Sequence, residues 1–533
     1  MEDRDFLTPQ DPLGPFRHER IIRRAEDEKS TLLLSQVDLF DEVLARGSPL
    51  IIGRRGSGKT AIVNALLAAS GNHDYYRGRR GSGGDSRDFY AFINSWDHLA
   101  EIVEKVGNDI RYSMGDDSDW SAVLAETAAR HWSSRFWHVI FQQIYQQSRR
   151  SDDPRNLREE LKSVVNYFTG ADFLPRSASI SAENIHEATS NLRREVVNYL
   201  KREKLRCFVV IDSLEDYPVQ SPMFRKVLSG FLKCVNEFED DHPNCKIICC
   251  LPEEIEPIIR EYSSNKIKDL TTASSVSRLR WRPIDLLRIV AERYRKFLLL
   301  HVDDDQDFIA EMTQLNLSNR SELGKFFKRI MPRFIVNRFG QQEDSLAYIV
   351  RHSQLLPREF ILIFSRAIVK SHALKGSWRY IEPSAIVGAI EEQEPELVDQ
   401  VMGPYKELYP SLIREARAVI PELRPIFSKS DMDRLGARLD KATRHELNAD
   451  PWEVLYQIGV IGFLDDFGGA HSHAFYEYGR FQYNSKAEIT FAKDRRYCVH
   501  PIFSGTWKVR QAGRDAGQKF IYPADVELNI WED

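Results

Sequence analysis

The residues best suited to chemistry are eight consecutive positions, 53–60, with the sequence GRRGSGKT. Their spacing, G-x-x-x-x-G-K-[ST], is that of a loop that binds nucleotide phosphates. The glycines let the backbone curl until successive N–H groups face one phosphate, and the following helix N-terminus adds partial positive charge. In such a loop Lys59 contacts the β- and γ-phosphates and the Thr60 hydroxyl joins a Mg²⁺ site. The alternative is a tight turn with a surface lysine, which the full match makes the weaker interpretation. The predicted nucleotide contacts are Gly53, Arg54, Arg55, Gly56, Ser57, Gly58, Lys59, Thr60 and Ala61.

A carboxylate at the end of an apolar run completes the predicted site. The run 207–211 ends at Asp212, and Glu215 and Asp216 follow. An Asp at the carboxyl end of such a strand lies beside the phosphate loop, where it can hold Mg²⁺ through water. Glu215 or Asp216 is then placed to orient or deprotonate the attacking water. The plainer alternative is a strand that ends in a capping Asp, which is common in any α/β protein.

Strands and helices must alternate to bring these residues together. Uninterrupted apolar runs indicate strands covered on both faces, as in parallel sheets. Segments with helical apolar spacing lie between them, so the sequence predicts an α/β fold with a P-loop parallel sheet of about five strands flanked by helices. The predicted strands cover residues 49–52, 89–93, 206–212, 246–251 and 275–281.

The chain changes character after the last of these strands. From Pro283 to about residue 420 the apolar spacing is helical and no strand is predicted. Within this region Pro357 suits a helix start, so Arg358 is expected in the first turn of that helix. By default Arg358 is a solvent-exposed arginine with little energetic meaning. The sequence therefore predicts an all-α region that follows the sheet strands in the chain, with Arg358 as its candidate functional residue.

The last part of the chain is predicted to mix helices and short strands. A helix over 451–463, closed by glycine, is followed by strands at 474–483, 488–491 and 497–503, a layout that resembles a winged-helix module. Basic and aromatic residues near these strands are candidates for contacts with DNA phosphates, although a solvated hairpin or a protein-docking surface explains them equally well. They are Arg480, Lys486, Lys493, Arg495, Arg496, Trp507, Lys508 and Arg510.

Length and composition agree with a multidomain soluble protein. The 533 residues suggest three or four domains at about 150 residues each. We expect a P-loop core with an N-terminal helical segment (1–282), a helical lid (283–375), a helical connector (376–440) and a winged-helix-like domain (441–533).

Charge and apolar runs bound the partners and the location. A net charge of −5 gives no overall attraction to nucleic acid or to an anionic membrane. The longest apolar runs, such as 207–211 and 297–300, are far shorter than the roughly 20 residues of a membrane helix, and the N-terminus lacks a signal-peptide core. The six cysteines show no metal-ligand spacing, so we expect buried reduced thiols in a cytoplasmic protein.

The combined motifs resemble the AAA+/STAND group of P-loop ATPases. The resemblance is carried by the loop 53–60, the acid strand 208–212 with its following SLED, and the sequence LPRE at 356–359. By this resemblance Asp212 is the magnesium-side acid and Glu215 or Asp216 the catalytic acid, as in STAND and NACHT proteins. Arg358 resembles the second sensor of such ATPases, which reaches the γ-phosphate from the lid. The resemblance implies ATP and Mg²⁺ as cofactors, and kinship suggests a role in bacterial antiviral defence.

The sequence departs from that pattern in two places. The run 246–251 lacks the Asn or Thr of a first sensor and offers Cys249, Cys250 and Glu253 instead. No arginine finger is evident beyond the candidates Arg260, Arg278 and Arg280. Slow turnover is therefore expected.

Four functions stay open at this stage. The leading hypothesis is a regulatory ATPase that switches or assembles a partner protein, with a nucleotide-dependent oligomer as one form of output. A DNA-engaging loader or initiator that uses residues 441–533 is the main alternative, with a nucleotide-binding scaffold of little turnover and a small-molecule P-loop kinase behind it. ATP is the default nucleotide because no guanine-specifying motif is evident.

Overall fold

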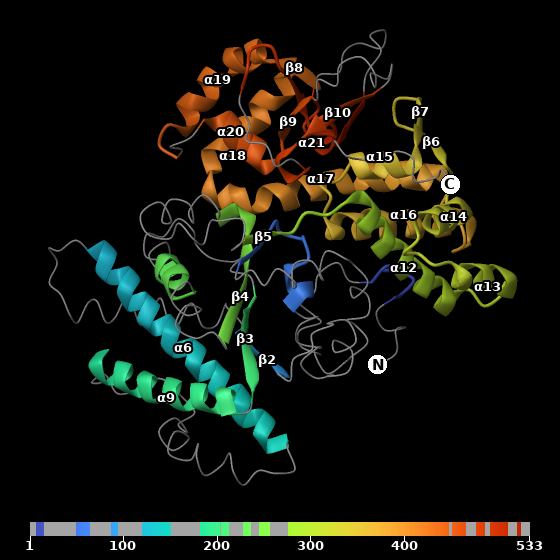
Figure 1. The fold of residues 1–533 in the computed structure, drawn as a ribbon. Helices are drawn as coiled ribbons and strands as arrows, with labels where there is room; N and C mark the ends of the chain where they lie inside the picture. The colour runs from blue at the N-terminus through green and yellow to red at the C-terminus, as the bar shows by residue number, and fades with distance from the viewer. Residues whose placement is uncertain are drawn as a thin grey trace. The chain divides into compact units, whose positions relative to one another are not determined.

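A computed structural model describes thirteen stretches of the chain, shown as ribbon elements in Figure 1. They are residues 7–14, 50–63, 87–93, 120–150, 182–202, 204–212, 227–235, 245–255, 276–446, 450–464, 476–484, 491–509 and 520–523. The chain divides into two compact units. The core unit comprises Phe40–Arg54 and Lys59–Leu279, and the C-terminal unit comprises Met1–Leu39, Arg55–Gly58 and Arg280–Asp533.

The core unit contains a sheet of five parallel strands in the order β2-β3-β4-β1-β5. This confirms the predicted parallel sheet, and each strand falls close to its predicted range. Because the strands are parallel, the carboxyl ends of β1, β4 and β3 lie along one edge, with β4 between the other two. The strands are β1 (Leu50–Gly53), β2 (Arg87–Ile93), β3 (Leu205–Ile211), β4 (Cys245–Pro252) and β5 (Val276–Arg278).

Two long helices pack on this sheet. Helix α6 (Trp120–Arg150) contacts β2, β3 and α9 (Ala182–Arg202), and the pair lies side by side in Figure 1. The aromatic residues Trp132 and Phe136 of α6 are buried in the apolar core, where both meet Phe231 of the helical stretch 227–235. The aromatic spacing of α6 therefore serves packing.

Helices dominate the first half of the C-terminal unit. Helix α16 packs between α12 and α17, and its ends follow local rules: Pro357 opens it, and Gly376, with φ of 67°, closes it in the left-handed conformation. The helices are α12 (Pro283–His301), α13 (Gln306–Gln314), α14 (Arg320–Ile330), α15 (Ser345–Arg351), α16 (Pro357–Lys375) and α17 (Pro383–Leu408).

One prediction for this region is wrong. Strands β6 (Phe334–Val336) and β7 (Gln342–Asp344) form an antiparallel hairpin where only helices were expected. Each strand has three residues, and Ile335 and Glu343 are the buried members of a side-chain alternation that is too short to recognise in a sequence.

The end of the chain folds into helices around a five-stranded mixed sheet, in agreement with the predicted small α+β fold. One strand of this sheet, at Ile426–Ser428, lies in the range 376–440 that was predicted as a helical connector, so that part of the prediction is wrong. The sheet has the order β12-β10-β9-β11-β8, with β12 parallel to β10 and the other pairs antiparallel. The strands are β8 (Ile426–Ser428), β9 (Ile461–Leu464), β10 (Tyr476–Arg480), β11 (Arg496–Val499) and β12 (Phe520–Pro523), and the helices are α18 (Pro410–Val419), α19 (Lys429–Thr443), α20 (Pro451–Ile458) and α21 (Pro501–Thr506).

Two boundaries in this domain differ from the prediction. Helix α20 stops at Gly459, with φ of 82°, and residues 461–464 form β9, whereas a helix was predicted through residue 463. The strand predicted over 497–503 ends at Val499, and Pro501 starts α21. In both places a glycine or proline ends one element and permits the next. Residues 488–490 of the predicted strand 488–491 lie outside the described residues.

All six cysteines are buried and none forms a disulfide bond, as expected for reduced thiols. Among the described residues, none of the helices has the length and apolar character needed to cross a membrane.

Candidate nucleotide-binding site

The glycine-rich loop follows β1 and adopts the curled backbone that its sequence predicts. Gly56 and Gly58 have φ angles of 87° and 93°, values that side chains with a Cβ rarely adopt. Helical structure begins at Lys59, so the loop leads directly into a helix N-terminus. Successive N–H groups in such a turn form a concave anion site.

Lys59 is folded back into this loop. Its ammonium donates hydrogen bonds to the carbonyl oxygens of Gly53 (2.8 Å) and Arg54 (3.0 Å), and the residue is 3% exposed. Hydrogen bonds to carbonyl dipoles keep a buried charge solvated, while a phosphate would add full negative charge at the same place. A phosphate bound in the loop could therefore replace these carbonyl oxygens as the hydrogen-bond acceptor of Lys59.

The two distant halves of the predicted metal site come together. The Thr60 hydroxyl donates to a carboxylate oxygen of Asp212 over 3.4 Å, although the residues are 152 positions apart. Asp212 directly follows β3. A hydroxyl and a carboxylate are the hard oxygen ligands that Mg²⁺ prefers, and in nucleotide sites phosphates and waters supply the remaining ligands. This donor pair fits Mg²⁺. Among the described residues, no group of three His, Cys, Asp or Glu side chains is arranged so that it could hold a metal ion.

The other predicted catalytic groups are not all covered. Glu215 and Asp216, the candidate water-activating acids, lie outside the described residues, as does Arg260. Arg278 lies on β5 opposite Ile52 of β1, and Arg280 follows shortly after. An arginine finger can act within its own chain or on a neighbouring one, so the arginine-finger role of Arg278 or Arg280 stays a prediction.

The end of β4, where the resemblance led us to expect a first sensor, carries cysteines in place of an Asn or Thr. Cys249 and Cys250 are fully buried, and burial, together with the nearby Cys250 and Asp212, raises the pKa of the Cys249 thiol well above its usual value. Glu253 follows β4 and forms an ion pair with Arg54 of the phosphate loop (3.4 Å). Glu253 thus constrains the loop, a role that the sequence alone did not indicate.

The tip of the loop, residues 55–58, belongs to the C-terminal unit and meets two of its side chains. A Cβ added to Gly56 would lie 3.2 Å from the Cβ of Arg358 and 3.4 Å from its Nε. The indole N–H of Trp281 donates a hydrogen bond to the carbonyl oxygen of Ser57 (2.8 Å). Arg358 therefore lies against the tip of the loop, and its contact with a γ-phosphate stays a prediction. The sequence did not indicate Trp281.

The segment before Arg358 is buried and held in place from several sides. Leu355 has φ of 57°, a rare conformation for a residue with a large side chain. The backbone N–H of Gln354 donates to a carboxylate oxygen of Glu359 (2.5 Å), and its side-chain amide donates to the carbonyl oxygen of Gly459 at the end of α20 (3.2 Å). This segment connects the first turn of α16 to the small C-terminal domain.

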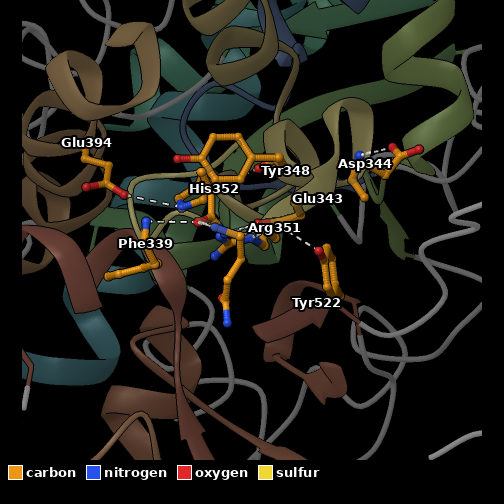
Figure 2. A network of polar contacts seen from close by, with 11 residues as sticks. Phe339, Glu343, Asp344, Tyr348, Arg351, His352, Glu394 and Tyr522 are labelled. Carbon is orange, nitrogen blue, oxygen red and sulfur yellow. Dashed lines mark hydrogen bonds and ion pairs between the residues drawn. The ribbon is translucent and has the colours of Figure 1, made fainter. Parts of the chain in front are cut away.

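A second polar cluster lies elsewhere in the C-terminal unit (Figure 2). The Arg351 guanidinium donates two hydrogen bonds to the Glu343 carboxylate (2.5 and 3.1 Å) and lies over the rings of Tyr348, Phe520 and Tyr522. We call the following residues the Arg351 cluster: Arg338, Glu343, Tyr348, Arg351, His352, Glu394 and Tyr522.

Burial sets the protonation of this cluster. It lowers the pKa of His352 well below the usual value, and the positive charge of Arg351 acts in the same direction. Burial also raises the pKa of Glu394 despite the nearby Arg338. His352 and Glu394 are 3.5 Å apart. Within the cluster Arg351 pairs with Glu343 and Arg338 pairs with Glu394, an arrangement that suits a structural connection between the helices and strands that carry these residues.

The predicted basic surface of the C-terminal domain is partly used internally. Arg496 pairs with Glu477 (2.9 Å), the Arg495 guanidinium stacks on the ring of Phe463, and Trp507 is 8% exposed. Lys493 and Lys508 are exposed. Lys486 and Arg510 lie outside the described residues.

Comparisons with known proteins give remote likenesses only. No protein-family model and no curated protein matches the sequence. The solved structures include ORC2 of Aeropyrum pernix in ADPNP–ADP complexes, at 12% identity and a TM-score of 0.38, covering 87% of this chain and 88% of that one. The ADP form of the same protein has 13% identity, a TM-score of 0.30 and coverage of 92% of both chains. ORC1 of Aeropyrum pernix in complex with DNA has 13% identity, a TM-score of 0.26 and coverage of 86% and 88%.

Each of these TM-scores lies below 0.5, so the likenesses assign neither a family nor a function to this chain. The functional argument depends on the loop, its lysine and its acid.

Proposed function

We propose that this protein is a P-loop ATPase of the AAA+ kind that binds Mg-ATP through residues 53–61 and hydrolyses it slowly. The observation that carries the proposal is the 3.4 Å contact between the Thr60 hydroxyl and Asp212, at the carboxyl edge of a parallel sheet. If Asp212 only capped the end of its strand, there would be no reason for it to contact a hydroxyl in the helix turn that follows a glycine-rich loop. The closer resemblance to STAND proteins depends on the catalytic role of Glu215 or Asp216. We therefore propose the STAND subtype and that role together.

Each group has a distinct role in this proposal. Lys59 exchanges the carbonyl oxygens of the loop for β- and γ-phosphate oxygens, so its charge is neutralised by the ligand. Thr60 and Asp212 would hold Mg²⁺, which would supply Lewis-acid stabilisation of negative charge on the phosphates. Glu215 or Asp216 orients the attacking water, and Arg358 contacts the γ-phosphate over Gly56.

The regulatory output follows from the residues next to Arg358. Gln354 bonds to the end of α20, and four residues later Arg358 lies on the phosphate loop. A γ-phosphate that attracts Arg358 would favour one arrangement of the segment 354–358. Hydrolysis of ATP would remove that phosphate and so release the segment. We propose that the small C-terminal domain passes this change to a partner protein. Antiviral defence stays a prediction from kinship.

A DNA-engaging ATPase is the alternative. Exposed Lys493 and Lys508 favour it, and the helix–strand–helix–helix–strand order from α18 to β9, with β11 between β8 and β9, supports a winged-helix-like domain. Against it, six of the eight residues of α20 are buried, and Glu453 is an exposed acid on that helix. A DNA affinity that falls steeply with salt would favour this alternative over a protein partner.

Phosphate release from ATP tests the proposed activity. The parent should release phosphate only with Mg²⁺, and Asp212→Asn should lower the rate at least tenfold while ATP still binds. Asp494→Asn, an exposed acid in the C-terminal domain, is the matched control and should keep the parent rate. Metal-independent turnover, or equal rates in parent and Asp212→Asn, would refute the assignment of Asp212.

A further inference from the structure

Trp281 stands in an unusual place for a buried tryptophan. It follows β5 and precedes α12, and it is 5% exposed. Buried indole N–H groups usually find an acceptor, and here the acceptor is the carbonyl oxygen of Ser57, 224 positions earlier. Ser57 is itself fully buried between two glycines with positive φ. The partner of Trp281 is therefore the backbone of the phosphate loop at its most sharply turned point.

The hydrogen bond has a directional consequence. A trans peptide group is planar, so its C=O and the following N–H point in opposite directions. Fixing the Ser57 carbonyl on Trp281 therefore turns the N–H of Gly58 away from the indole. The N–H groups of such glycine-rich turns are the ones that bind phosphate. Without this hydrogen bond the Ser57–Gly58 peptide group could rotate, because glycine adopts many backbone conformations.

On the basis of the proposed function, we infer that Trp281 is a positioning residue that orients the Ser57–Gly58 peptide group for phosphate binding. It also ties the tip of the loop to the start of α12. A loop already held in its binding conformation loses less entropy when the ligand arrives. Removal of the indole N–H leaves a buried carbonyl oxygen without that donor and lets the peptide group turn.

Calorimetric titration of ATP into three proteins tests this inference. Trp281→Phe keeps an aromatic ring and removes the donor, and we expect about tenfold weaker ATP binding. Trp132→Phe is the matched control, because Trp132 is also buried and its indole nitrogen has no hydrogen-bond partner among the described residues. Its affinity should equal that of the parent. Trp281→Leu, which also lacks a hydrogen-bond donor, gives a second variant with the same expectation if Trp281→Phe fails to fold.

Tryptophan emission separates positioning from plain packing. Addition of ATP should change the emission of the parent and of Trp132→Phe, and this change should be absent from Trp281→Phe. Equal ATP affinity in parent and Trp281→Phe, or an equal emission response, would overturn the inference and leave the proposed function intact. A parent protein that binds no ATP would overturn both.

Discussion

The phosphate loop and the Arg351 cluster both bury positive charge, but they neutralise it differently. Lys59 donates to two carbonyl oxygens of its own loop, whereas Arg351 faces the carboxylate of Glu343 and three aromatic rings. Tyr522 donates a further hydrogen bond to Glu343 over 2.6 Å. Partial charges of carbonyl groups are easily replaced by a phosphate, while a paired carboxylate is not. The comparison teaches that the first arrangement suits a ligand and the second suits a permanent joint.

The largest effect that would sharpen this comparison is expected at the joint. Arg351→Met should lower the free energy of unfolding of the C-terminal unit by about 3–5 kcal/mol, because it leaves a buried carboxylate unpaired. Urea denaturation measures the change, and ATP affinity should stay within about twofold of the parent.

The double variant Arg351→Met/Glu343→Gln is the control for that experiment. It removes both charges and should recover part of the loss. An Arg351→Met protein as stable as the parent would contradict the structural role of the cluster.

The sequence predicted one of these two regions and not the other. The loop and the strand ending at Asp212 are local patterns, and the parallel topology then brings their ends together. The Arg351 cluster joins Glu343 to Tyr522 across 179 positions, and the Trp281 contact spans 224. Such contacts depend on how helices and strands pack, which no local pattern contains. The β6–β7 hairpin was missed for a different reason, since three-residue strands carry almost no periodicity.

An intermediate effect is expected at Arg358, which lies on the loop but outside the cluster. Arg358→Ala should remove most of the protection from proteolysis that ATP confers, about a tenfold change in cleavage rate, because the segment that bonds to α20 no longer senses the γ-phosphate. Limited proteolysis with and without ATP measures it. Arg366→Ala, an exposed arginine on the same helix, should behave as the parent. Equal ATP-dependent protection in Arg358→Ala and the parent would remove Arg358 from the site.

The smallest expected effect lies in the N-terminal segment 7–14, which docks on α12 and α16. Arg293 donates to the carbonyl oxygen of Leu13 (2.8 Å), and Ser365 donates to the Asp11 carboxylate (3.4 Å). Burial raises the pKa of Asp11 from 3.8 to about 6, and the Ser365 hydrogen bond and the charge of Arg293 only partly oppose the rise. Asp11 therefore favours docking fully below about pH 4, and this contribution is lost as pH rises through about 6.

Hydrogen exchange of residues 7–14 between pH 4 and 7 tests this pH dependence. Because Asp11 is only partly buried, solvent reduces the effect to about 1 kcal/mol. Asp11→Asn should remove the loss of protection at higher pH. A parent whose protection rises between pH 4 and 7, after correction for intrinsic exchange, would show that the sign is wrong.

The central claim is that a ligand phosphate replaces the loop carbonyl groups around Lys59. Calorimetric titration of Mg-ATP into the parent, Lys59→Ala and the exposed-lysine control Lys246→Ala tests it most directly. We predict saturable binding to the parent and to Lys246→Ala, and at least a hundredfold loss in Lys59→Ala. Equal affinities in all three proteins, or no binding to the parent, would contradict the account.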